Sequence, residues 1–83
     1  MLVRNVIKKA IKFGMVPEVR QHVIEITNPR NGRRVSGRYI GERTSGQWRV
    51  HGIQPDRPEY DEFHSYYVQT LKSALEKIND KRV

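Results

Sequence analysis

The sequence predicts a small α+β domain in which a three-stranded antiparallel sheet lies between an N-terminal amphipathic helix and a long C-terminal helix. Three observations lead to this prediction. Apolar residues recur at three- and four-residue steps near both ends of the chain, β-rich segments fill the middle, and turn-forming residues separate those segments. A chain of 83 residues has room for one core, so we expect residues 1–83 to form a single domain.

The first predicted element is an amphipathic helix over residues 2–13. Its apolar residues recur three and four positions apart, which places them on one side of a helix, and Gly14 supplies a stop signal. The opposite side carries Lys8, Lys9 and Lys12, and no acidic residue occurs in this segment. We therefore expect the helix to bury its apolar side and to present a stripe of lysines to solvent.

Three strands are predicted in the middle of the chain, at residues 22–27, 33–43 and 47–53. The first is rich in β-branched residues, and turn-forming residues at 28–32 and 44–46 separate the three segments, which favours an antiparallel meander. Because side chains alternate across a strand, the pattern assigns residues to two faces. The apolar face contains Ile24, Ile26, Val35, Tyr39, Trp48 and Val50, and the mostly basic face contains Glu25, Arg34, Ser36, Arg38, Arg49 and His51.

Two isoleucines do not follow this alternation. Ile40 and Ile53 fall on the polar side of their strands. An inserted residue shifts the alternation by one position, so we expect a β-bulge near Gly41 or Gly52.

The C-terminal part of the chain predicts a long helix after a connector at residues 54–58. Acidic residues at its start suit the positive end of a helix dipole, and its apolar stripe would lie across the apolar face of the sheet. The aromatic residues of this stripe, together with Tyr39 and Trp48, are best explained as core residues, whereas Tyr66 is expected to be exposed. The stripe consists of Tyr60, Phe63, Tyr67, Leu71, Ala74 and Ile78.

Positive charge is concentrated in the first helix and the sheet. Residues 1–54 contain eleven of the sixteen Lys and Arg residues but three of the nine acidic residues. Clustered positive charge on a small domain favours a polyanionic partner, usually a nucleic acid and less often an anionic membrane surface. The sequence therefore predicts a non-catalytic nucleic-acid-binding protein, DNA-binding or RNA-binding, with a regulatory role and an origin in a phage or other mobile element. The predicted phosphate contacts are Lys8, Lys9, Lys12, Arg30 and Arg33, while Arg34, Arg38 and Arg49 would reach phosphates or base edges.

The composition argues against several other classes. The chain has no cysteine and its three histidines occur singly, so we expect neither a metal site nor a bound cofactor. No apolar stretch approaches the roughly twenty residues that a membrane span needs, so we expect a cytoplasmic protein. An edge strand could pair with a second copy of the chain, which makes a homodimer a further expectation.

Several short segments resemble the HicA family of toxin ribonucleases, a branch of the double-stranded-RNA-binding-like fold. Residues 20–22 (Arg-Gln-His), 28–29 (Asn-Pro) and 32–35 (Gly-Arg-Arg-Val) are similar to the first hairpin of that family, and residues 70–75 resemble the start of its last helix. The predicted order of helix, three strands and helix is also the order of that fold. The resemblance implies a ribonuclease in which His22 would be the catalytic histidine.

Three alternatives to simple nucleic-acid binding remain open at this point. A ribonuclease toxin would cleave RNA and arrest growth, and both effects would disappear with His22→Ala. A small inhibitor or adaptor would bind an acidic host protein through its basic surface and would retain that partner after nuclease treatment. A membrane-surface peptide would need the N-terminal helix free to insert, but the core requires the apolar side of that helix.

Overall fold

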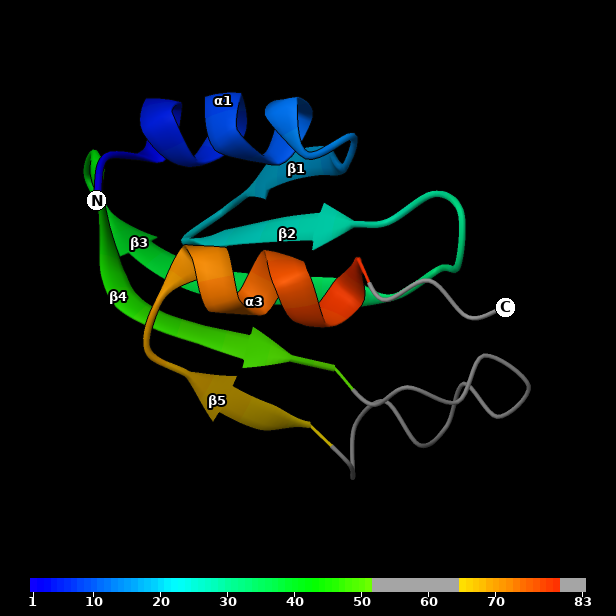
Figure 1. The fold of residues 1–83 in the computed structure, drawn as a ribbon. Helices are drawn as coiled ribbons and strands as arrows, with labels where there is room; N and C mark the ends of the chain where they lie inside the picture. The colour runs from blue at the N-terminus through cyan, green and yellow to red at the C-terminus, as the bar shows by residue number, and fades with distance from the viewer. Residues whose placement is uncertain (52–64, 80–83) are drawn as a thin grey trace.

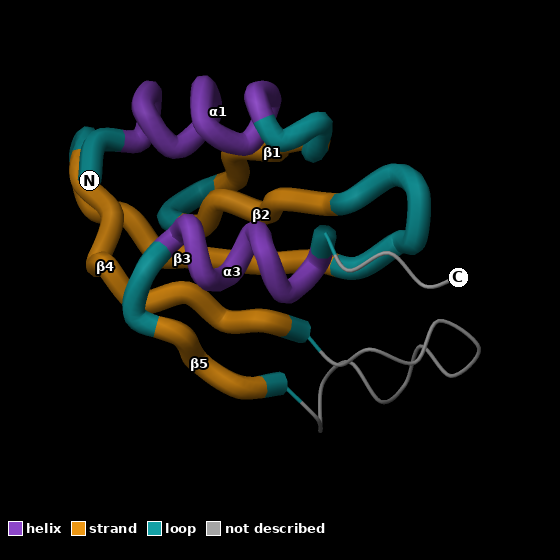
Figure 2. Tube along the Cα trace, viewed as in Figure 1, coloured by secondary structure: helices purple, strands orange, loops and turns teal. Residues whose placement is uncertain are grey.

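The computed structural model describes residues 1–51 and 65–79. This part of the chain contains two helices and five strands, shown as a ribbon in Figure 1 and by type in Figure 2. They follow the order α1 (Val3–Lys12), β1 (Val16–Arg20), β2 (Val23–Thr27), β3 (Arg34–Ile40), β4 (Arg43–Val50), β5 (Tyr66–Val68) and α3 (Leu71–Ile78).

The strands form one antiparallel sheet in the order β1-β2-β3-β4-β5, so each described strand pairs with its neighbours along the chain. Figure 1 shows α3 crossing the sheet and α1 lying alongside β1. Both helices contribute to one cluster of buried side chains, with Val6 and Ala10 from α1 and Leu75 and Ile78 from α3 packed with Trp48 of the sheet. The helices therefore cover one side of the sheet, and the other side is called the outer face below.

The N-terminal helix is confirmed, since α1 spans Val3–Lys12 within the predicted range 2–13. Val6 and Ala10, which lie four residues apart, are fully buried against the sheet. Of the helices in the described residues, neither has the length and apolar character needed to cross a membrane.

The prediction of three strands is wrong, because the sheet has a further strand at each edge. β1 (Val16–Arg20) lies where the sequence predicted no element. Four of its five residues are exposed, so it lacks the apolar alternation that identifies a half-buried strand. β5 (Tyr66–Val68) lies in residues that were assigned to the long helix, although aromatic and β-branched residues suit a short edge strand.

The C-terminal helix is correspondingly shorter than predicted. α3 begins at Leu71, after Thr70 accepts a hydrogen bond from the Ser73 amide at 3.1 Å through its hydroxyl oxygen. This N-cap separates the helix from β5, and the apolar residues from Leu71 to Ile78 remain buried as expected. The connector at 54–58 and the predicted acidic start of the helix lie outside the described residues.

The reversal between β3 and β4 occurs at Gly41 and Glu42, so the predicted turn at 44–46 is wrong and these residues belong to β4. Gly41 adopts a φ of 62° in the turn, a conformation that glycine reaches without steric cost. Ile40 needs no bulge, because it ends β3 with 85% of its surface exposed. The other predicted bulge position, Gly52, lies outside the described residues.

A bulge does occur, but within β4. Gly37 pairs with Trp48 and Tyr39 pairs with Thr44, so β4 has more residues between these pairs than β3 has. Gly46 lies in this bulged segment with a φ of 82°. Bulges bend a strand and increase its twist, and Figure 1 shows that β4 curves strongly along its length.

The assignment of side chains to two faces is confirmed for β2, β3 and β4. Tyr39 is partly buried against the core, and the polar set lies on the outer face at intermediate or high exposure. The fully or almost fully buried members of the apolar set are Ile24, Ile26, Val35, Trp48 and Val50.

Candidate functional site

The outer face presents polar and charged side chains from adjacent strands. Glu25, Ser36, Arg49 and Tyr67 lie side by side across β2, β3, β4 and β5, because each pairs with the next in the strand register. Arg38 lies two residues from Ser36 along β3 and is exposed on the same face. Arginines from adjacent strands thus emerge on the side of the sheet that α1 and α3 leave uncovered.

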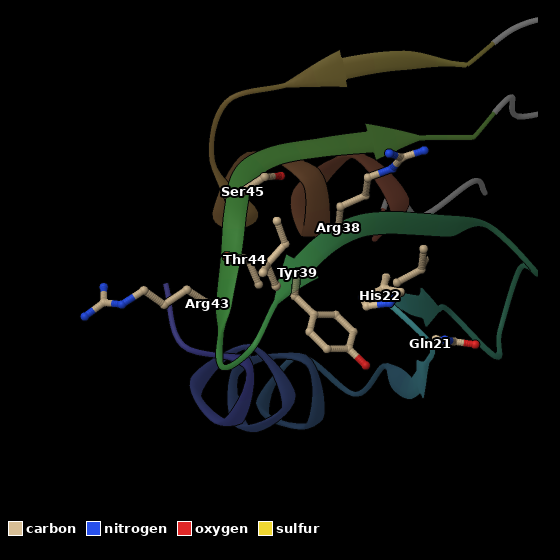
Figure 3. A pocket seen from close by; sticks show the side chains of 9 residues that line it. Gln21, His22, Arg38, Tyr39, Arg43, Thr44 and Ser45 are labelled. Carbon is tan, nitrogen blue, oxygen red and sulfur yellow. The ribbon is translucent and has the colours of Figure 1, made fainter.

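A polar hollow lies on the outer face, and an apolar hollow adjoins it at the end of the sheet, where the β1–β2 turn meets the end of β3 and the start of β4. The polar hollow has a volume of about 530 Å³ and the apolar hollow a volume of about 920 Å³, and Figure 3 shows the side chains that line the larger one. Val23, Arg38 and Ser45 line both hollows, so the two are neighbours. The polar hollow is further lined by Glu25, Ser36, Gly37, Gln47, Arg49, His51 and Tyr67, and the apolar hollow by Gln21, His22, Tyr39, Ile40, Arg43 and Thr44.

Hydrogen bonds orient the side chains of the polar hollow. Ser36 Oγ and His51 Nε2 are 2.9 Å apart, which joins β3 to the end of β4. Arg49 Nε donates to Ser65 Oγ at 2.7 Å. Tyr67, which is 58% exposed, lies opposite Arg49 in the register. The polar hollow therefore combines two guanidinium groups, an imidazole, hydroxyl groups and an exposed aromatic ring with one carboxylate, that of Glu25. The cationic, hydroxyl and aromatic groups suit phosphate, sugar and base contacts.

The apolar hollow is built around Tyr39 of β3 and His22 of the β1–β2 turn. The Tyr39 hydroxyl donates to the carbonyl oxygen of Arg20, and the Tyr39 amide donates to the carbonyl oxygen of His22 at 3.1 Å. The two ring centroids are 6.4 Å apart. Figure 3 shows Arg38 and Arg43 extending away from this pair in different directions. The Tyr39 ring is thus held in place, and the two arginines lie at the margins of the hollow.

The acidic side chains of the outer face lie toward β1 and β2, where they are neutralised locally. Arg20 Nη2 is 2.8 Å from Glu18 Oε2 and 3.7 Å from Glu25 Oε1. Within the described ranges, Arg38 and Arg43 have no ion-pair partner. The glutamates Glu18 and Glu25 therefore pair with Arg20 and not with Arg38 or Arg43.

Arg30 and Arg33, two of the predicted phosphate contacts, lie in the β2–β3 loop, which is tied to the end of α3. Asn28 Nδ2 donates to the carbonyl oxygen of Ile78 at 2.7 Å, and Arg30 Nη2 donates to Asn79 Oδ1 at 2.9 Å. Arg33 is only 5% exposed. The loop closes the C-terminal end of α3, and these two arginines are not part of the surface formed by Arg38 and its neighbours.

The predicted lysine contacts also lie apart from the arginines. Lys8 and Lys12 are exposed on α1 and Lys9 is partly buried, while α1 packs on the side of the sheet opposite the outer face. Of the eight predicted contact residues, the structure brings together Arg34, Arg38 and Arg49 on the outer face, and it separates the other five from them.

His22 does not lie in a strand, as the predicted strand at 22–27 implied, but in the turn before β2. It has a φ of 63°, an unusual conformation for a residue other than glycine, and it is exposed. Its ring lines the apolar hollow beside Tyr39 and Arg38. Among the side chains described, no three His, Cys, Asp or Glu residues are grouped as metal ligands.

The sequence did not identify Tyr67 as a surface residue of this site, because its spacing matched the stripe of the predicted helix. Its position in β5 exposes it, whereas Trp48 is buried as expected. Tyr66 is 40% exposed, which confirms that part of the prediction. Tyr60 and Phe63 lie outside the described residues. A run of two tyrosines and a valine was the available signal for β5.

No family model, curated protein or solved structure matches this chain. The resemblance to HicA ribonucleases therefore remains a prediction from the sequence, and the assignment of function rests on the outer face.

Proposed function

We propose that this protein binds nucleic acid through the outer face of its sheet, without catalysing a reaction. The observation that supports the proposal is the common location of Arg34, Arg38 and Arg49 on the outer face, which neither α1 nor α3 covers, with Arg38 and Arg49 lining the polar hollow. Guanidinium groups bind phosphate oxygens through charge-assisted and often bidentate hydrogen bonds. A cytoplasmic location, predicted from the sequence, would bring such a surface into contact with both RNA and DNA.

The proposal has a quantitative consequence for salt dependence. Each phosphate that a protein neutralises releases condensed counterions, and the slope of log K against log salt changes by about 0.7 per contact for single strands and about 0.9 for duplex DNA. If Arg34, Arg38 and Arg49 each neutralise one phosphate, the slope should be roughly −2 to −3.

The direct test is a salt-series binding assay on duplex DNA, single-stranded DNA and RNA, with Arg38→Gln compared against Lys77→Gln. Arg38 is exposed on the outer face, and Lys77 is exposed on α3, so both substitutions remove one surface charge. We expect Arg38→Gln to weaken binding and to flatten the slope by about 0.7 to 0.9, and Lys77→Gln to change neither appreciably. Affinity that does not depend on salt, or equal effects of the two substitutions, would refute the proposal.

A ribonuclease is the second candidate, and it is favoured by one specific observation. His22 and His51 line adjoining hollows that share Arg38, so each imidazole lines a hollow that also contains this guanidinium group. General acid–base catalysis needs such groups near a bound substrate. The same binding samples, examined for RNA degradation over time, decide between the candidates: cleavage that disappears with both His22→Ala and His51→Ala would replace the binding function with a catalytic one. RNA that is bound and recovered intact supports binding alone.

A further inference from the structure

We infer that the apolar hollow is a pocket for an unstacked nucleobase, so that the preferred ligand is a single strand and not a duplex. This inference rests on the proposed nucleic-acid-binding function and specifies the form of the ligand. It starts from the chemistry of the lining, which combines the Tyr39 ring, the His22 ring and the side chains of Val23 and Ile40. Bases are flat and aromatic, and proteins that bind single strands hold them against rings and apolar surfaces.

The pocket is preorganised, which reduces the entropic cost of binding. The Tyr39 ring is oriented by the hydrogen bond from its hydroxyl to the Arg20 carbonyl, and the backbone of Tyr39 is fixed by the bond from its amide to the His22 carbonyl. The His22 ring lies 6.4 Å from it, centroid to centroid, at an interplanar angle of 42°. The two rings are therefore tilted and do not stack on each other.

The size of the hollow and the position of the cations agree with this ligand. The volume of about 920 Å³ lies within the range of about 300 to 1,000 Å³ that is typical of small-molecule sites, so a base with its sugar can enter. Arg38 and Arg43 lie at the margins of the hollow, where the phosphates on either side of an inserted base would be. Arg38 also lines the polar hollow, so its guanidinium group is available to a strand bound at either hollow.

The shape of the surface favours a single strand over a duplex. Proteins read a duplex by inserting a protruding helix or β-ribbon into a groove, because the bases themselves are stacked inside. The apolar hollow is a depression, and its lining rings can reach a base only when that base leaves the stack. A single strand offers such bases at little cost, whereas a duplex must first be opened.

The test compares a short single-stranded RNA, the matching single-stranded DNA, the duplex, and a single strand in which consecutive nucleotides are abasic. We expect both single strands to bind more tightly than the duplex, and the abasic strand to bind at least about fivefold more weakly than the intact strand.

Two variants test the pocket itself. His22→Asn removes the ring and keeps a residue that tolerates a positive φ, and it should weaken binding to the intact strand but not to the abasic strand. Ile40→Ser should do the same without changing the salt slope, since Ile40 is uncharged and 85% exposed.

The matched control is Ile11→Ser, which removes an exposed isoleucine from α1 at 60% exposure and should leave binding unchanged. Salt-dependent binding that is equal for intact and abasic strands, or that is strongest for the duplex, would overturn the base pocket while leaving the proposed function intact. An absence of binding to every one of these nucleic acids would overturn the proposed function and the pocket together.

Discussion

Gly37→Ala is expected to destabilise the protein, because a methyl group at this position would overlap the ring of Trp48. A Cβ atom built on Gly37 lies 2.3 Å from Cζ3 and 2.5 Å from Cε3 of Trp48, whereas carbon atoms in contact are usually about 3.5 to 4.0 Å apart. The ring must therefore move by more than about 1 Å. Trp48 is only 2% exposed and packs within the core, so its movement disturbs the packing between sheet and helices.

The size of the effect follows from two opposing contributions. Overpacking a well-packed core costs about 1 to 3 kcal/mol, and replacing glycine by alanine in a strand returns about 0.5 to 1 kcal/mol of conformational entropy. We expect a net loss of about 1 to 2 kcal/mol, which corresponds to a fall in Tm of roughly 4 to 16 °C for a domain of this size. Thermal unfolding followed by circular dichroism measures the loss. The fluorescence of Trp48, the one tryptophan of the chain, reports whether its environment changes.

The same substitution in a Trp48→Leu protein tests whether the overlap with the Trp48 ring causes the loss of stability. In a Trp48→Leu variant the ring atoms that meet the new methyl group are absent, so Gly37→Ala should cost little there and could be stabilising. An equal loss of stability in both backgrounds would refute the proposed overlap. A Gly37→Ala protein with unchanged Tm and unchanged fluorescence would refute it as well.

Three further predictions concern the end of α3, its beginning and the outer face. Asn28→Ala should lower the free energy of unfolding by about 1 to 3 kcal/mol in a urea titration, because it removes two hydrogen bonds, one of the two donors to the Ile78 carbonyl and the acceptor for the Arg30 amide; an unchanged value would contradict the structural role of the β2–β3 loop. Thr70→Ala should cost about 0.5 to 2 kcal/mol by removing the acceptor for the Ser73 amide, whereas Thr70→Ser should retain most of that stability. Glu25→Gln removes a negative charge from the polar hollow, and at low salt it should raise affinity for single-stranded RNA roughly twofold. This factor corresponds to a repulsion of about 0.5 kcal/mol between the Glu25 carboxylate and a bound phosphate about 8 Å away in water. Weaker binding of the variant would count against phosphate contacts in this hollow.

The sequence identified those elements whose residues are half buried. α1 and the strands β2, β3 and β4 each have one apolar and one polar side, and this alternation was sufficient to predict both their type and which side chains face the core. β1 and β5 lie at the edges of the sheet and have mostly exposed residues, so they leave no such pattern. Edge strands are recognised through their partners, and pairings such as Glu18 with Glu25 are not visible in a local window of sequence.

The candidate site was predictable to a similar extent. The alternation in β3 and β4 placed Arg38 and Arg49 on one face, but charge alone could not separate them from Arg33, which is buried beside the end of α3. Tyr67 was assigned to the core because its spacing fits a helix as well as a strand. The apolar hollow was not predicted at all, since it depends on the bulge in β4 and on the conformation of His22, which arise from the three-dimensional pairing of segments.

The core and the arginine-bearing outer face depend on the same strand register. A slip of one residue in β3 would exchange Val35 and Gly37 for Ser36 and Arg38 on the buried side, which the core cannot accept. The close approach of Gly37 and Trp48 helps to fix that register, because only a residue without a side chain leaves room for the ring. The arrangement that buries the apolar face therefore also determines where the arginines emerge.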